Sequence, residues 1–275
     1  MLTFNGKHIT ELSGAYKSIR TTRLVLPDTD DRIMSMPGMD GVYDYGRNLK
    51  ENEITVEILI QAGSPQELIA CSRQIAAWLD TETVRPLIFD QEPDKQYMAR
   101  RRGGIVLDKI TAKAAICRVN FFIPRPYAED IGSTVTGLTG ENTGTEKTPC
   151  IITCTIKVAG TERHYFMGPT FGIKTGDDIV PADGLKVELL ETGEFLRIAK
   201  KAGLPNLALT HGDVVEFNTA SRLITVNGAS AMAYRTLDSK FFHLPKKSEF
   251  TLDATIEGPP ETKLTAETTF RQLWR

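Results

Sequence analysis

Apolar and polar residues alternate with a period of two along much of this chain, and no other sequence feature constrains the fold as strongly. The clearest run extends from Ile54 to Ile60, with apolar residues at even positions and Thr55 and Glu57 between them. Similar runs occur at 115–123, 150–158, 185–189, 224–226, 250–256 and 264–274. Such alternation indicates half-buried strands, and many short strands separated by turns are typical of sandwiches and barrels. The sequence therefore predicts a mainly β protein.

One segment departs from this pattern and predicts a helix over about residues 65–79. Ser64 is placed to act as the N-cap, Pro65 occupies the first helical position, and Glu67 would close a capping box. Apolar residues then recur at helical spacing, so the helix should lay an apolar stripe against a sheet. Residues 193–201 are compatible with either a short helix or a strand.

A stretch between Tyr127 and Thr148 divides the chain. It is rich in glycine, serine and threonine and has almost no apolar periodicity, which is typical of loops and linkers. We predict an N-terminal β domain with one helix over residues 1–132, a linker over 133–147, and an all-β domain over 148–275.

Charge and hydropathy exclude several partners. The chain of 275 residues has 33 basic and 35 acidic residues, a net charge of −2, so no basic excess predicts nucleic-acid binding. The run Arg100–Arg102 is interpreted as a solvated turn. No stretch of 18 apolar residues predicts a membrane span. The N-terminus lacks a signal-peptide pattern, so we expect folding in a reducing cytoplasm, with all four cysteines as free thiols.

The sequence predicts no catalytic residue, no cofactor and no metal site. Cys150 and Cys154 on one strand would lie about 13 Å apart, too far for a disulfide or a shared zinc ion, so both are interpreted as core residues. Asp177 and Asp178 are interpreted as a turn. Neither a phosphate-binding loop nor a paired-histidine motif is present.

Two further features leave questions open. Phe121 and Phe122 should point to opposite faces of one strand, so one of them needs a cover other than the first core. The helix, the second domain or a subunit interface could provide it. The charged segment from Pro27 to Arg47 is too long for an ordinary hairpin connection, and long loops in compact domains are often functional.

An ordered set of short motifs spans residues 4–128. They are Phe4–His8, Pro37–Asp44, the strand Ile54–Ile60, Ala77–Asp80, Leu87–Asp90, Asp94–Arg100 and Phe121–Ala128. In order and spacing together they resemble the distal tail protein (Dit) family of siphophages.

Three segments of the second half resemble the galectin-like sandwich that forms the carboxy-terminal domain of that family. They are Gly212–Phe217, Arg222–Gly228 and Leu237–Leu244. A galectin-like fold does not by itself bring sugar binding. His211, Asn218 and Arg222 loosely resemble the galectin sugar-binding cluster, but no tryptophan occurs between Trp78 and Trp274 to stack on a sugar.

The resemblance implies a structural phage protein rather than an enzyme. Six copies would form a ring hub at the tail tip of the virion, assembled in the bacterial cytoplasm, that joins the tail tube protein to tail-tip or baseplate proteins. First domains would form the ring and second domains a collar. A ring requires two different complementary faces on each subunit. We expect the long loop to contribute to one face, with Pro37, Gly38, Asp40, Gly41 and Tyr43 as candidate interface residues.

Two other function classes were weighed. A carbohydrate-binding module would recognise host cell-wall glycans through the second domain; the sandwich favours it and the missing aromatic platform opposes it. A wall hydrolase would need paired carboxylates in a cleft, and the sequence offers no distinctive pair.

Overall fold

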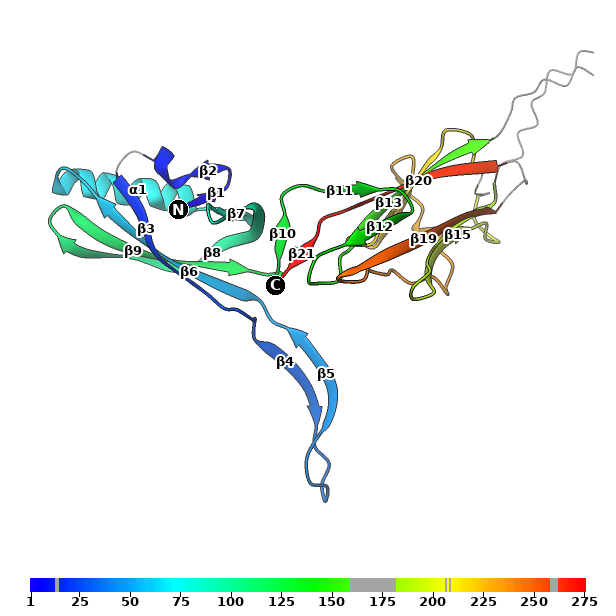
Figure 1. Cartoon of the computed structure of the whole chain (residues 1–275), viewed down its shortest axis with the longest axis horizontal. Coiled ribbons are helices and arrows are strands. Elements are labelled where there is room, and N and C mark those ends of the chain that lie inside the picture. The colour runs from blue at the N-terminus through cyan, green and yellow to red at the C-terminus, as the bar shows by residue number, and fades with distance from the viewer. Residues whose placement is uncertain (13–14, 159–181, 206, 208, 258–261) are drawn as a thin grey trace, which may run out of the picture. The chain divides into compact units, whose positions relative to one another are not determined.

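A computed structural model describes the whole chain except residues 13–14, 159–181, 206, 208 and 258–261. The described residues form two compact units, one comprising Met1–Gly132 with Leu273–Arg275 and the other Ser133–Gln272 (Figure 1). Both are built of antiparallel sheets, and the described part of the chain contains one α-helix, which confirms the predicted mainly β fold. No described helix is long and apolar enough to cross a membrane. The turn predicted at 177–178 lies outside the described residues.

The first unit is built on one nine-stranded sheet in the order β2-β1-β7-β8-β9-β6-β3, in which β10 also pairs with β8 and β21 pairs with β10. Its strands are β1 (Leu2–Phe4), β2 (Lys7–His8), β3 (Ala15–Arg23), β6 (Asn52–Gln61), β7 (Arg85–Phe89), β8 (Glu92–Thr111), β9 (Ala114–Ile123), β10 (Ala128–Asp130) and β21 (Leu273–Trp274). The alternation in β6 and β9 is confirmed, because their apolar positions are buried in one core.

The helix α1 (Pro65–Leu79) covers this core with the stripe that the sequence predicts. Ser64 caps it by accepting the N–H of Glu67 at 3.1 Å. The Glu67 carboxylate accepts the N–H of Gly63 at 2.8 Å. The expected capping box would have used the N–H of Ser64 itself, so the bond is made one residue earlier in the chain. Trp78, near the other end of the helix, donates its indole N–H to the carbonyl of Phe4 at 3.1 Å. The helix is thereby tied to the first strand as well as to the core.

Ser64→Ala is expected to destabilise the first unit by about 1 kcal/mol, because the N–H of Glu67 loses its partner. Urea unfolding followed by tryptophan fluorescence measures this change in the first unit alone, since Trp78 and Trp274 both belong to it. Ser72→Ala, inside the same helix, is the matched control and should leave the midpoint unchanged or slightly raised. Equal losses in the two variants would contradict the capping role.

The two adjacent phenylalanines of β9 have different covers. Phe121 is buried, with its ring centroid 5.3 Å from that of Phe4. Phe122 lies on the other face beneath two guanidinium groups, Arg100 at 4.7 Å and Arg102 at 5.2 Å from its centroid. These arginines belong to β8, so the turn predicted at 100–102 is wrong. Cation–π contacts on the neighbouring strand hold this basic run in the sheet.

The second unit is a sandwich of two sheets, ordered β11-β20-β13-β16-β17-β18 and β12-β19-β14-β15. Its strands are β11 (Thr134–Thr136), β12 (Thr139–Asn142), β13 (Cys150–Val158), β14 (Gly184–Leu189), β15 (Glu194–Ala199), β16 (Val214–Asn218), β17 (Leu223–Val226), β18 (Ala229–Ser230), β19 (Ser248–Glu257) and β20 (Thr262–Phe270). Side chains from both sheets share one core. Cys150 and Cys154 are buried in it, as expected of core residues. The ambiguous segment 193–201 forms a strand.

The linker predicted over 133–147 is wrong, because β11 and β12 lie within it and pair with β20 and β19. One of its glycines has a packing role: a Cβ on Gly140 would lie only 2.7 Å from the ring of Phe250. The glycine content of this segment resembles that of a linker, but at Gly140 it allows the backbone to approach the core closely.

The last predicted strand, 264–274, is also divided. Residues up to Phe270 belong to the second unit as β20, whereas β21 pairs with β10 in the first unit. Trp274 holds this return, with its indole N–H 2.6 Å from Asp130 and the Lys95 ammonium 4.5 Å from its ring centroid.

Candidate assembly surface

The segment predicted to be a long loop is a hairpin of two strands, β4 (Thr29–Met34) and β5 (Tyr43–Leu49), that projects from the first unit (Figure 1). We call residues 29–49 the arm. Its strands pair with each other and with no other described strand. An isolated two-stranded hairpin is at best marginally stable in water. Nearly all arm residues are exposed, so the arm lacks the burial that usually holds such a hairpin.

A bulge explains why the sequence did not predict these strands. The register shifts between Asp31 and Ile33, so that two residues of β5 face one of β4 and β5 carries one extra residue. Gly46 stands in the bulge with a φ of +88°, and its N–H donates to the Asp44 carboxylate at 2.8 Å. A bulge interrupts the two-residue period on which strand prediction depends.

The five candidate interface residues lie together at the outer end of the arm. Pro37 and Gly38 occupy the corner of a turn in which the N–H of Met39 donates to the carbonyl of Met36 at 3.3 Å. Gly38 has a φ of +82°, as a type II turn requires at this position. Asp40 and Gly41 follow in the same connection, and Tyr43 begins β5; all five are exposed.

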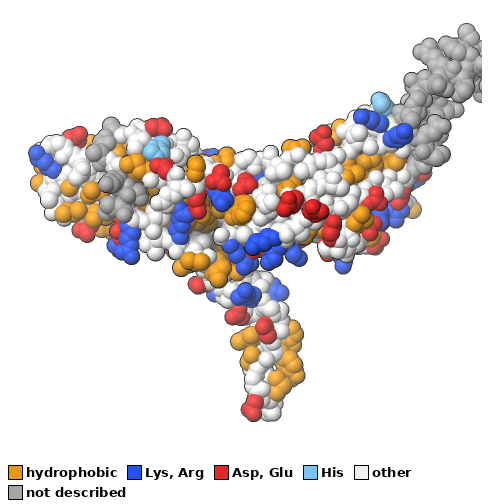
Figure 2. Space-filling model, viewed as in Figure 1, with side chains coloured by type: hydrophobic (Ala, Val, Ile, Leu, Met, Phe, Trp, Pro, Cys, Tyr) orange, Lys and Arg blue, Asp and Glu red, His pale blue; other side chains and the backbone are white. Residues whose placement is uncertain are grey.

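One face of the arm carries an apolar cluster. Met34 and Tyr43 are directly opposite each other, and the Tyr45 hydroxyl reaches the Met34 sulfur at 4.0 Å. Tyr45 is 62% exposed, and Figure 2 shows hydrophobic side chains along the arm. Further exposed apolar residues of the arm are Ile33, Met36, Met39 and Val42. Exposed apolar patches mark interaction sites, and methionine and tyrosine are enriched at interface cores.

The root of the arm is fixed by contacts that no sequence pattern indicates. Arg23, at the end of β3, lies 4.0 Å from the Phe89 ring centroid and donates to Glu92 at 2.7 Å. Beside it, burial raises the pKa of Tyr97. These partners come from strands more than 60 residues away along the chain, so no local pattern could reveal them. Together they hold the strand from which the arm departs.

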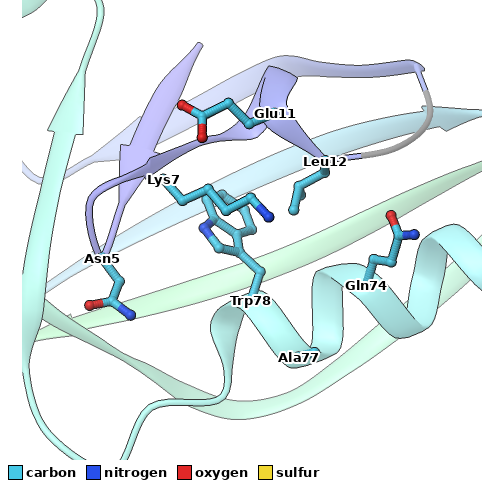
Figure 3. Close-up of a pocket in the computed structure, with 7 residues that line it drawn as sticks. All are labelled: Asn5, Lys7, Glu11, Leu12, Gln74, Ala77 and Trp78. Atoms are coloured by element: carbon cyan, nitrogen blue, oxygen red, sulfur yellow. The ribbon is translucent and has the colours of Figure 1, made fainter.

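A depression with a volume of about 580 Å³ lies elsewhere, between the β1–β2 turn and α1 (Figure 3). Its lining residues are Asn5, Lys7, Glu11, Leu12, Gln74, Ala77 and Trp78. The Glu11 carboxylate accepts the N–H of His8 at 3.3 Å as part of a helical cap. The lining therefore offers a single carboxylate that already has a structural role. No cluster of potential metal ligands occurs in the described ranges.

The loose galectin-like set is not assembled. Asn218 and Arg222 bracket the turn between β16 and β17, where the Asn218 side chain accepts the N–H of Ser221 at 2.9 Å. His211 precedes the opposite end of β16, a strand of 5 residues, which spans about 17 Å. The three side chains therefore belong to opposite ends of one strand.

Comparison with known proteins decides the family. Residues 14–123 match the phage tail protein RIFT-related domain. Residues 164–274 match the C-terminal domain of the siphovirus-type tail component. The chain belongs to the Dit family of siphophage tail components. It is thus a structural component of a phage tail rather than an enzyme. No curated protein sequence matches this chain.

One solved structure agrees with this chain at the level of the fold. The crystal structure of the Dit protein of phage SPP1 matches with a TM-score of 0.73 and 14% identity, covering 100% of this chain and 98% of that one. That protein is described as a paradigm of the hub adsorption apparatus in phages that infect Gram-positive bacteria. The phage P2 baseplate in its activated conformation with Ca gives a weaker match, with a TM-score of 0.45 and 9% identity over 94% of this chain and 91% of that one.

Proposed function

We propose that this Dit-family protein forms a six-fold ring hub that joins the tail tube protein to tail-tip or baseplate proteins. The first units form the ring and the second units a collar. The arm is the observation that carries the proposal: it is a paired hairpin with an uncovered apolar face, which an assembly would bury. The full-length likeness to a protein described as part of a hub supports the same role.

A closed ring also explains why the arm differs so much from the rest of the unit. Each subunit of a ring presents two different faces, one for each neighbour. An extended arm is one such face, and its outer end carries Pro37, Gly38, Asp40, Gly41 and Tyr43. All five residues are exposed, so their side chains are available for a contact with another chain.

Native mass spectrometry of the full-length protein, with negative-stain images of the same sample, tests the ring. Six copies per particle and ring-shaped images are the expected result. A strict monomer at high concentration contradicts the proposal. Binding of host glycans by the second unit is the alternative hypothesis, which a glycan array on the full-length protein tests.

The variant Asp40→Ala/Gly41→Val is expected to weaken ring assembly about tenfold while leaving the first unit folded. Gly41 has a φ of +92° with no heavy atom within 4 Å of an added Cβ, so valine strains the backbone by about 1–2 kcal/mol without a clash. Gly193→Val is the matched control, because Gly193 has a φ of +68° and equal space in a turn of the second unit. Native mass spectra across a dilution series measure the effect, and an unchanged ring in the double variant would contradict the interface role.

A further inference from the structure

Half of strand β8 has an unpaired edge. β7 pairs with β8 only as far as Ala99, and from Arg100 to Thr111 the described residues place a ladder partner on one side alone, strand β9. We call Arg100–Thr111 the free edge. It carries two exposed apolar side chains, Val106 at 71% and Ile110 at 57%. Unpaired edges of this kind are templates for a strand from another chain.

The free edge and the arm lie at opposite sides of the same sheet. The order β8-β9-β6-β3 places the free edge at one side and β3 at the other. The arm follows directly from β3, and it returns into β6. One unit therefore presents a projecting hairpin on one side and an open strand on the other. This is the pair of unlike faces that a head-to-tail ring requires.

The two faces also have opposite charges. The arm carries four aspartates against two arginines, a formal charge of −2. The free edge carries three arginines and Lys109 against Asp108, a formal charge of +3. Within the chain, Arg101 lies 3.6 Å from Asp80 and Arg102 lies 3.5 Å from Glu51, so these two charges are partly balanced and Arg100 and Lys109 carry the rest. Complementary charges of this kind favour the correct partner and orientation during association.

The length of the arm suits a contact with a neighbouring unit. Strand β4 (Thr29–Met34) advances five residues, which at about 3.3 Å per residue spans roughly 17 Å before the connection to β5 extends it further. The arm is therefore long enough to lie along several residues of a neighbouring strand.

We propose that the arm of one copy docks on the free edge of the next copy by strand addition. Backbone groups of the arm pair with those of Arg100–Thr111, and the cluster of Met34, Tyr43 and Tyr45 covers Val106 and Ile110. Main-chain pairing supplies affinity in such contacts and alternate side chains supply specificity. This inference rests on the proposed ring, and it names the surface that receives the arm.

Cysteine cross-linking of the full-length protein tests the contact. All four native cysteines are buried, and burial raises the pKa of Cys150 and Cys154 to about 12, so engineered surface cysteines react first with a short bis-maleimide. The variant Tyr45→Cys/Val106→Cys is expected to give a ladder of covalent oligomers up to the full ring. Each single variant should give no ladder, because a head-to-tail contact keeps identical positions apart. The control Tyr45→Cys/Thr22→Cys places the second thiol on exposed Thr22 of β3, at the opposite edge.

A second experiment avoids cross-linking. Val106→Glu/Ile110→Glu adds two negative charges to the free edge and is expected to raise the apparent dissociation constant of the ring at least tenfold. The unfolding midpoint of the first unit should not change, because both side chains are exposed. Leu237→Glu is the control, since Leu237 of the second unit is 96% exposed, and it should leave the ring intact.

The outcomes separate the contact from the ring itself. A ladder with Val106→Cys but not with Thr22→Cys, together with weaker rings in the glutamate variant, supports docking on the free edge. A ladder only with Thr22→Cys, or an unmodified protein that forms rings which neither double variant cross-links, overturns this contact and leaves the ring proposal standing. An unmodified protein that stays monomeric in the native mass spectrum overturns the proposed function.

Discussion

Phe121→Ala is expected to destabilise the first unit by about 3–5 kcal/mol, because it empties the centre of a close-packed core. The ring of Phe121 lies 5.3 Å from that of Phe4, and Phe4 in turn lies 6.0 Å from Trp78 of the helix. Removing the central ring therefore loosens the contact of β1, β9 and α1 at once. Urea unfolding followed by tryptophan fluorescence measures the loss, since both tryptophans belong to this unit.

Phe122→Ala is the matched control one residue away. Its ring is covered by Arg100 and Arg102 rather than by the core, and a cation–π contact at an exposed site contributes about 0.5–1 kcal/mol. We expect a cost of about 1 kcal/mol. Similar losses for the two variants would contradict the assignment of Phe121 to the core and Phe122 to the outer face.

Asn142→Ala is expected to destabilise the second unit by about 2–4 kcal/mol. The buried Asn142 amide donates to the carbonyl of Pro245 at 2.8 Å and to that of Glu146 at 3.2 Å. Its oxygen accepts the N–H of Gly144 at 3.1 Å. Alanine would remove the partner of the Pro245 carbonyl and of the Gly144 N–H, whereas the Glu146 carbonyl still accepts the Thr148 hydroxyl at 3.3 Å. Each unsatisfied buried group costs about 1–3 kcal/mol. The amide thus holds the end of β12 against the residues that lead into β19.

Hydrogen exchange read by mass spectrometry measures this loss, because the second unit contains no tryptophan. Amides of β12 and β19 should exchange roughly 30- to 1,000-fold faster, since every 1.4 kcal/mol is a factor of ten. Thr143→Ala, at the exposed neighbouring residue, should change exchange by less than about threefold. Unchanged protection in Asn142→Ala would show that water replaces the amide at no cost.

Strand prediction succeeded where each strand has one buried face. β6, β9 and β13 keep strict alternation over nine or ten residues, so their period of two is visible without knowledge of their partners. Helix α1 was equally visible, because its cap, its proline and its apolar stripe are all local signals. These elements depend on their own sequence more than on the rest of the fold.

The errors have two physical causes. In β12 and in the arm, glycines and a bulge replace the regular period, so sequences that form strands resemble loops. In β8 and β21 the partner decides the structure: the Arg100–Arg102 run is held by Phe122 of the neighbouring strand, and β21 by Trp274 contacts to Lys95 and Asp130. A pattern within one segment cannot report contacts with another segment, whether these lie 20 residues away, as for Arg102 and Phe122, or 144 residues away, as for Trp274 and Asp130.

The sequence predicted which residues lie in the exposed segment, but it did not predict that this segment forms a hairpin. Pro37, Gly38, Asp40, Gly41 and Tyr43 were identified from turn dipeptides in a long segment, and they do lie together at the end of the arm. The apolar face behind them was not foreseen, since it arises from the pairing of Met34 with Tyr43. The free edge of β8 was also invisible, because an edge is defined by the strands that are absent beside it.

The return of the chain to the first unit makes the second unit an insertion rather than an appendage. The chain departs just after β10 and comes back as β21, and these two strands are paired neighbours, with Ala128 opposite Trp274. The points of exit and re-entry are therefore about 5 Å apart, the spacing of adjacent strands. Any domain whose own ends lie close together could occupy the same position without disturbing the host sheet. The first unit thus constrains the inserted domain only through the short distance between its two ends.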